Sequence, residues 1–194
     1  MLRLYYPYIV SVSIIAWLLP PIRQYGTKYF FYFLIIASGD IFGFLYVKFI
    51  NHENNLIVFY LLAFFCLLSV IDKKHLVRFS GLLWSLIFIV LVIAFWESNN
   101  LIRFLIISGL HFAILLVILK SLIIYLFNEK KIDFFLFFLI FYEGTVTTKY
   151  IALIAGPLFS GNYYYLITSI FEISIAVVFV LFKYGGTKLI FQFR

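Results

Sequence analysis

Charged residues are scarce in this chain. Only 12% of its 194 residues are Asp, Glu, Lys or Arg, whereas 65% are hydrophobic, and the mean hydropathy is +1.12. A soluble domain carries roughly 25% charged residues, so this chain has too little polar surface to face water. The scarcity of charge therefore predicts an integral membrane protein whose main solvent and first partner is the lipid bilayer.

Metal- and cofactor-binding residue types are also few. The single cysteine, Cys66, excludes an internal disulfide, and three histidines with one cysteine supply too few ligands for a zinc site. A membrane haem of the b type takes two facing histidines, but only His111 lies within an apolar run, since His52 and His75 fall between runs. No Gly-rich phosphate loop is present. We therefore predict no metal and no cofactor.

The chain also lacks features that divide a protein into parts. The opening stretch "MLRLYYPYIVSVSIIAWLLPP" has no small-residue cleavage site, so we interpret it as a first membrane helix rather than a signal peptide. No linker or low-complexity segment interrupts the sequence, which predicts a single domain over residues 1–194. No internal repeat is visible, and this weighs against transporter folds that are built from repeats.

Long apolar segments make up most of the chain. A membrane-spanning helix needs about 20 predominantly apolar residues, and seven segments approach or exceed that length. They are Tyr5–Pro21, Tyr29–Ile50, Asn55–Ile71, Gly81–Trp96, Leu101–Phe127, Phe134–Gly156 and Tyr163–Phe182. The fold class predicted from them is an all-α, polytopic bundle of seven transmembrane helices.

The basic residues predict the orientation of this bundle. If seven spans are assumed, ten of the 15 Lys and Arg residues fall on the side that holds the C-terminus, and three fall on the other side. Cytoplasmic loops attract Lys and Arg, so we expect the N-terminus outside and the C-terminus inside a bacterial inner membrane. The net charge of +7 arises from these short loops, and we therefore predict no binding of nucleic acid.

Three carboxyl side chains interrupt the apolar segments at one depth. Asp40, in "IIASGDIFGF", lies 12 residues from the inner border of its segment, while Glu143 and Glu172 lie 12 and 11 residues from theirs. At ~1.5 Å per residue, all three sit roughly 17 to 18 Å above the inner border, near the midplane. Ionisable groups at that depth face the bundle interior and find partners, so we predict an acidic cluster there.

Two further ionisable residues are expected nearer the outer face. His111 and Lys149 lie 17 and 18 residues from their inner borders, at roughly 26 Å. Two arrangements remain open. We expect at least one of the three carboxyls to be protonated at neutral pH and to share a hydrogen bond with another of them. The alternative is that they pair with His111 or Lys149 across a vertical gap of roughly 9 Å. In both cases Asp40, Glu143, Glu172, His111 and Lys149 form the predicted polar core, which is a ligand or proton site.

Two glycines on the Asp40 segment predict close helix packing. Gly39 and Gly43 form a G-x-x-x-G pattern, which allows the backbone of a neighbouring helix to approach. The residues i−3 and i+3 from Asp40 are Ala37 and Gly43, so this face of the helix is small as well as polar. We therefore expect another helix, rather than lipid, to cover it.

Several short motifs resemble known membrane families. The seven-span outline resembles a microbial rhodopsin, but those proteins bind retinal through a lysine midway along the last helix, where this chain has Glu172. "ASGD" at 37–40 resembles the G-x-G-D of intramembrane aspartyl proteases, although Ala37 replaces the first glycine and no second membrane aspartate is present. "SGDIFGF" is similar to the acidic second helix of lysoplasmalogenase-type lipid hydrolases. "ISGLH" is similar to the Ser-Gly of rhomboid proteases, although Ser108 and His111 share one helix.

One broader resemblance concerns the second and third segments. Asp40, the tripeptide "NNL" at 54–56 and Tyr60 resemble a pattern found in small seven-helix bacterial inner-membrane proteins that have no assigned activity. This resemblance implies the seven-helix fold and the inner membrane, and it implies no reaction.

Three functions are compatible with these features. The first is a membrane module that responds to a ligand or a proton and acts through a partner membrane protein or a second copy of itself. The second is a proton-coupled transporter of a small solute. The third is an intramembrane lipid or peptide hydrolase with Asp40, Glu143 or His111 as acid-base groups. The very short loops leave no soluble catalytic domain, and this favours the first hypothesis over an enzyme.

Overall fold

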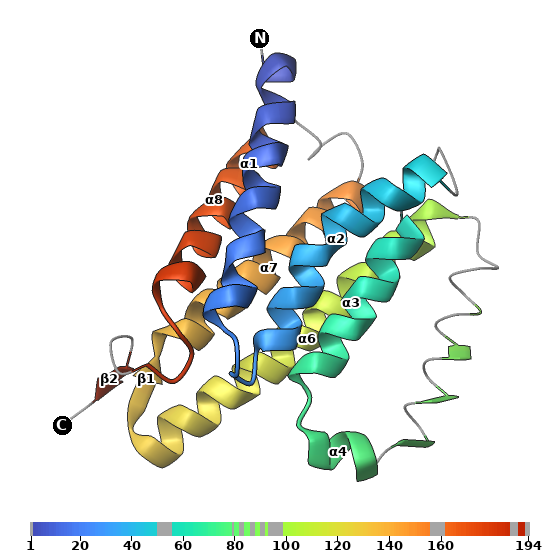
Figure 1. Cartoon of the computed structure of the whole chain (residues 1–194). Helices are drawn as coiled ribbons and strands as arrows, with labels where there is room; N and C mark the ends of the chain where they lie inside the picture. The colour runs from blue at the N-terminus through green and yellow to red at the C-terminus, as the bar shows by residue number, and fades with distance from the viewer. Residues whose placement is uncertain are drawn as a thin grey trace.

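The structure is a computed structural model that describes residues 2–49, 56–78, 80–81, 84–85, 88–89, 92, 99–155, 162–186 and 190–192. These residues form seven helices and two short strands (Figure 1). The helices are α1 (Leu2–Arg23), α2 (Phe30–Phe49), α3 (Leu56–Val70), α4 (Lys73–Arg78), α6 (Asn100–Glu129), α7 (Phe134–Ala155) and α8 (Asn162–Leu181). The strands are β1 (Lys131–Asp133) and β2 (Ile190–Gln192).

Six of the seven predicted segments coincide with long helices. The bounds of α1, α2, α3, α6, α7 and α8 agree with the predicted segments to within three residues at each end. The fourth predicted segment, Gly81–Trp96, lies mostly outside the described residues. Between α3 and this fourth segment, where no apolar segment was predicted, Lys73–Arg78 forms the short helix α4.

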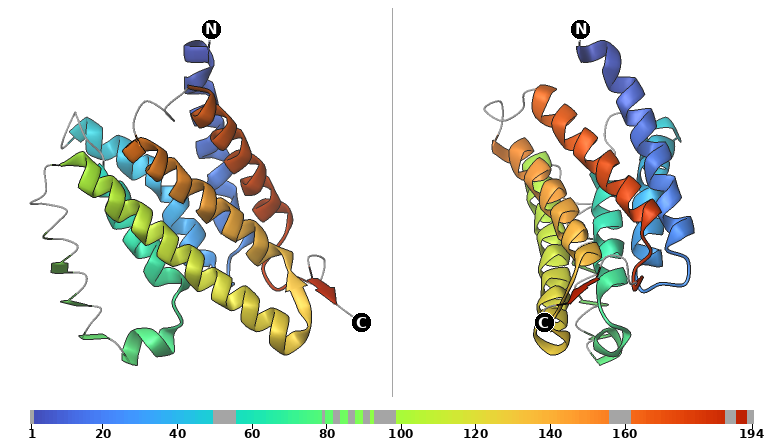
Figure 2. Two further views of the ribbon diagram at one scale, coloured as in Figure 1. Left: turned by 180° about the vertical axis from the view of Figure 1, so that it is seen from behind. Right: turned by 90° about the vertical axis from the view of Figure 1, so that its left-hand side faces the viewer.

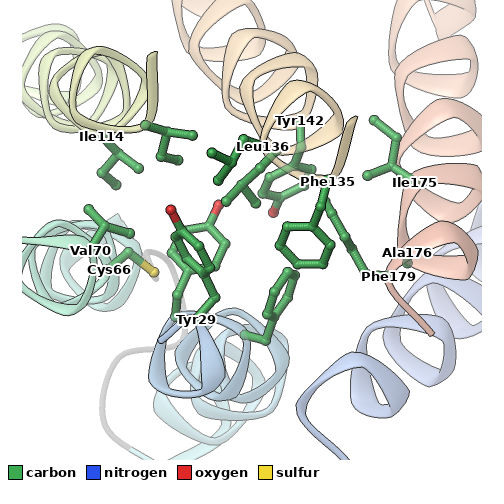
Figure 3. Packing of buried hydrophobic residues seen from close by; sticks show 14 of the residues in the cluster. Tyr29, Cys66, Val70, Ile114, Phe135, Leu136, Tyr142, Ile175, Ala176 and Phe179 are labelled. Atoms are coloured by element: carbon green, nitrogen blue, oxygen red, sulfur yellow. The ribbon is translucent and has the colours of Figure 1, made fainter. Parts of the chain in front are cut away.

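The six long helices pack in a ring. Contacts join α1 to α2, α2 to α3, α3 to α6, α6 to α7, α7 to α8 and α8 back to α1. Along this order the helices alternate in direction, except that α3 and α6 run the same way, as do α8 and α1 (Figures 1 and 2). The side chains that point inward form one apolar core to which all six helices contribute (Figure 3). Polar groups inside the ring are therefore largely surrounded by the six helices.

The outer surface of the ring is strongly apolar. Two helices, α6 and α7, are each long and apolar enough to cross a membrane, and only 33% of the residues in their most apolar stretches are buried within the protein. Large apolar side chains such as Phe112, Leu116 and Phe141 are about half exposed on these helices. A core helix of a soluble protein is mostly buried, whereas these helices present apolar surface outward.

Local chemistry fixes the helix ends. Asn99 caps α6 by accepting a hydrogen bond from the Leu101 N–H at 2.9 Å. Lys130, in the left-handed region at φ 51°, ends α6, and the chain then enters β1. The Asp133 carboxylate accepts a hydrogen bond from the Phe135 N–H at 2.9 Å and so caps α7. These caps set the register in which α6 and α7 face each other.

Candidate functional site

Glu143 lies at the centre of a polar cluster inside the ring. It is on α7, and its side chain is fully buried. Its Oε2 atom is 2.8 Å from Nδ1 of His111 on α6, and its Oε1 atom accepts a hydrogen bond from the hydroxyl of Tyr32 on α2. We call these three side chains the Glu143 cluster. It joins three helices through one carboxylate.

Several neighbours surround this cluster. The Tyr150 ring lies parallel to the His111 imidazole, with centroids 5.9 Å apart and an interplanar angle of 13°. The Cys66 thiol of α3 and the Tyr142 hydroxyl of α7 lie near Tyr32. Apart from His111, none of these neighbours is ordinarily charged at neutral pH. The charge of Glu143 is therefore balanced mainly by His111.

The geometry allows two protonation forms that keep the same hydrogen bonds. An ionised carboxylate only accepts, so Tyr32 donates through O–H and His111 donates through Nδ1–H. With a neutral imidazole the cluster carries one net negative charge. When a proton is added at Nε2, His111 becomes an imidazolium ion and the cluster has no net charge. In either form Nδ1–H donates to Oε2 of Glu143 and the Tyr32 hydroxyl donates to Oε1, so the two hydrogen bonds of the cluster are the same.

Only one member of the cluster is open to proton exchange. Tyr32 and Glu143 have no exposed surface, whereas 11% of the His111 side chain is exposed. A proton that enters or leaves the cluster therefore passes through the imidazole.

A second ion pair lies on another face of α7. The Nζ atom of Lys149 is 2.7 Å from Oε2 of Glu172 on α8. These side chains are 20% and 12% exposed, so the pair lies at the margin of the ring rather than at its centre. It holds α7 to α8 and brings together one cation and one carboxylate from the predicted polar core.

Among the side chains that the structure describes, Glu143 and Glu172 take the alternative arrangement, in which carboxyls pair with basic residues, and not the expected hydrogen bond between carboxyls. Glu143 pairs with His111, and Glu172 pairs with Lys149. The predicted depth of His111 was counted from Asn128, which was taken as the inner border of the span. Helix α6 has 30 residues and is ~45 Å long, which exceeds a ~30 Å core. Asn128 therefore lies beyond the border, and the depth counted from it is too great. The side chain of Asp40 lies outside the described residues.

The two glycines predicted to permit close packing are both buried. At Gly39, an added Cβ atom would lie 3.3 Å from Cδ1 of Leu62 on α3, which is closer than ordinary contact. Gly43, one turn later, is also buried. Helix α3 therefore covers this face of α2 near Asp40.

Sequence reasoning missed Tyr32 and Gln24. Tyr32 is one of 15 tyrosines, and no spacing marks it. Gln24 is fully buried at the end of α1, where its Nε2 donates to the carbonyl oxygens of Phe179 and Phe182 at 2.9 and 2.8 Å, and its Oε1 accepts from the Tyr184 N–H at 2.9 Å. Gln24 thus satisfies the free carbonyls at the end of α8.

Residues beyond α8 are held at the same end of the ring. Strand β2 pairs antiparallel with β1, with Phe191 opposite Ile132. The Tyr184 ring packs edge-on against Tyr29, with centroids 4.8 Å apart. Burial raises the pKa of the nearby Asp133 carboxyl, although its hydrogen bond from the Phe135 N–H opposes this effect. This arrangement positions the start of α7 and hence the register of Glu143.

Two hollows lie on the outside of the ring. One of about 500 Å³ runs between α2 and α3 and is almost entirely apolar, with Phe42 and Phe65 among its walls. The other, of about 470 Å³, lies over α7 between α6 and α8 and includes Gly144, Thr145 and Thr148. Both threonine hydroxyls donate to carbonyl oxygens of their own helix, so they offer no free donor to the surroundings.

Comparison with known proteins gives no relative. No family model matches the chain, and no curated protein or solved structure matches it. Within the described part of the chain, no group of three or more His, Cys, Asp or Glu side chains is arranged to hold a metal ion. The function must therefore be argued from the Glu143 cluster itself.

Proposed function

We propose that this chain is a multi-pass module of the bacterial inner membrane that responds to protons and acts through partner membrane proteins. The observation that carries the proposal is the Glu143 cluster, in which a fully buried carboxylate is bonded to one histidine and one tyrosine from two other helices. Ionisable groups inside membrane proteins cost at least ~2.5 kcal/mol each and mark functional positions by default.

The cluster would convert a proton into a change in helix packing. Below its transition, His111 is an imidazolium ion and its charge balances Glu143. Above the transition, the proton on Nε2 is lost and one negative charge remains inside an apolar ring. That charge is poorly solvated, so the contacts that join α2, α6 and α7 become less favourable. A partner packed on these helices would sense the difference.

Infrared difference spectroscopy tests this proposal directly. The full-length protein in lipid nanodiscs is titrated from pH 5 to 9, and the imidazole and carboxylate bands are recorded. We expect bands that change together in the wild type and are lost in both Glu143→Gln and His111→Gln. Lys149→Gln is the matched control, because it removes an ion pair on α7 and leaves the cluster intact. If the wild-type spectrum does not change across this range, the proposal is wrong.

The seven-span topology is part of the proposal. It is supported by the outward apolar surface of α6 and α7. It is also supported by the Lys and Arg residues, ten of which fall on the side of the predicted spans that holds the C-terminus. A reporter fused after Arg194 should read cytoplasmic, and a reporter inserted at 97–100 should read external. The opposite result at either position would overturn this topology.

One observation also favours a hydrolase as a second candidate. A carboxylate bound to Nδ1 leaves Nε2 of a histidine able to take a proton from a nucleophile, and His111 has this arrangement with Glu143. Release of fatty acid or aldehyde from membrane lipids by the purified protein, lost in His111→Gln and retained in Lys149→Gln, would support the enzyme. Lipid turnover that is the same in both variants would exclude it.

A further inference from the structure

The seam between α6 and α7 continues beyond the Glu143 cluster as a polar strip. The two helices are antiparallel, so residues before His111 on α6 and residues after Glu143 on α7 lead toward the same end of the ring (Figure 1). One turn from the pair in that direction lie Ser108 and Thr147, and each is only 7% exposed. The strip leads to the end of the ring at which α1 begins.

Thr147 has an unusual feature. Its Oγ1 atom is buried and has no hydrogen-bond partner. The two other threonines of α7 donate to a carbonyl oxygen of the preceding turn, Thr145 to Phe141 at 2.9 Å and Thr148 to Gly144 at 2.7 Å. A buried hydroxyl that makes no bond costs about 1–3 kcal/mol. Such a group is satisfied when a water molecule reaches it, provided that the water also finds other polar partners.

Polar partners for water are present on both sides of Thr147. Ser108 lies one turn before His111 on α6, and Glu143 lies one turn before Thr147 on α7. Within the cluster, only the His111 side chain has exposed surface. The group that exchanges protons therefore adjoins the strip that contains the unsatisfied hydroxyl.

We propose that water enters along Ser108 and Thr147 and carries protons between His111 and the end of the ring at which α1 begins. This inference rests on the proposed function, and it adds the route and the side from which protons arrive. In the step that matters, a hydronium ion on the strip gives one proton to Nε2 of His111 and becomes water. Nδ1–H remains bonded to Glu143, and the loss of the proton follows the reverse path.

Arg103 lies on α6 beyond Ser108, toward the end of the ring to which the strip leads, and its Nε atom is buried. The other charged and titratable groups near the route surround His111. Glu143 and Tyr32 face His111 from α7 and α2, and the Tyr150 ring stacks on it. The Cys66 thiol contributes from α3, while the Lys149–Glu172 pair holds α8 to α7. Because Lys149 and Glu172 are already paired with each other, proton exchange on the strip is assigned to His111.

Thiol accessibility tests the route without any assay of activity. Cys66 is the only native cysteine, so Cys66→Ala gives a thiol-free background into which Thr147→Cys, Ser108→Cys or Thr148→Cys is introduced. Sealed vesicles of both orientations are treated with Ag⁺, and the remaining thiols are counted by a maleimide gel shift after denaturation. The thiolate is the reactive form and needs water. Thr148→Cys is the control because Thr148 lies on the outer surface of α7. In the proposed topology this surface faces lipid, so a thiol there lacks the water that it needs to ionise.

We expect Thr147→Cys and Ser108→Cys to react at least about tenfold faster than Thr148→Cys, and only from the side that holds the start of α1. Equal rates at 147 and 148, or reaction only from the opposite side, would overturn the route. If the cysteine variants do not fold, Thr147→Val replaces them. It should slow the infrared response of the Glu143 cluster to a pH jump without moving its midpoint, whereas Thr148→Val should change neither.

These results separate the two proposals. The infrared bands of the cluster could change with pH as expected while the thiol of Thr147→Cys does not react. This result would refute the water route and would not affect the proposed proton response. A cluster that does not titrate would refute the proton response, whatever the accessibility of Thr147→Cys.

Discussion

The two ion pairs on α7 have similar geometry and different surroundings. Glu143 and His111 approach to 2.8 Å at the centre of the ring, and Glu172 and Lys149 approach to 2.7 Å at its margin. The central carboxylate has no exposed surface, while both members of the marginal pair are partly exposed. The partner of the central carboxylate is a histidine, and the partner of the marginal carboxylate is a lysine.

A lysine at the margin of the ring can extend its ammonium group toward the headgroup region if its partner is lost. A carboxylate at the centre cannot reach the surface in this way, so it is stabilised by its hydrogen bonds with Tyr32 and His111. The position within the ring, rather than the distance between the charges, therefore determines what each pair contributes.

The largest effect is expected at the centre. Glu143→Ala leaves Tyr32 and His111 without their shared acceptor, and breaking a buried pair in this way costs about 3–5 kcal/mol. Glu143→Gln should be much milder, because an amide can still accept from Tyr32 and donate to a neutral His111. The free energy of unfolding in detergent micelles measures both. A Glu143→Ala protein as stable as the wild type would show that the cluster is open to water.

An intermediate effect is expected from the tyrosine. Tyr32→Phe removes a hydrogen bond to a charged group and leaves the ring in place, which should lower the free energy of unfolding by about 1.5–3 kcal/mol. Tyr25→Phe is the control, because the Tyr25 side chain is 71% exposed. The same denaturation measurement applies. Equal stability of the two variants would mean that His111 alone satisfies Glu143.

The smallest effect is expected at the margin. Glu172→Ala should lower the free energy of unfolding by about 1 kcal/mol or less, because a partly exposed ion pair contributes little and Lys149 can turn outward. Lys149→Met should have a similar effect. If either substitution were as costly as Glu143→Ala, the distinction between centre and margin would fail.

Apolar length was enough to predict six long helices, whereas depth alone did not separate Glu143 and His111 in the core from Glu172 and Lys149 at the margin. Glu143, His111, Glu172 and Lys149 were all found from their positions in apolar segments. Tyr32 could not be found in this way, because a tyrosine in an aromatic-rich helix has no distinguishing neighbour pattern. Its role arises only when α2 and α7 face each other across the ring.

Gln24 and the two strands escaped prediction for a related reason. The amide of Gln24 stands in "PPIRQYG", where a glutamine in a turn is ordinary, and its partners are 155 and 158 positions away. Strands β1 and β2 have three residues each and are defined by their pairing with each other, not by an alternating pattern. Contacts between distant parts of the chain leave little trace in local sequence.

The contact between α1 and α8 has a consequence for how the protein is made. The acceptors of Gln24 are synthesised more than 150 positions after it, so α1 is made long before α8, its neighbour in the ring. Until α8 is made, the helices α1 to α7 can form only an open arc. Arrival of α8 closes the ring, and only this last step gives the amide of Gln24 its hydrogen-bond partners.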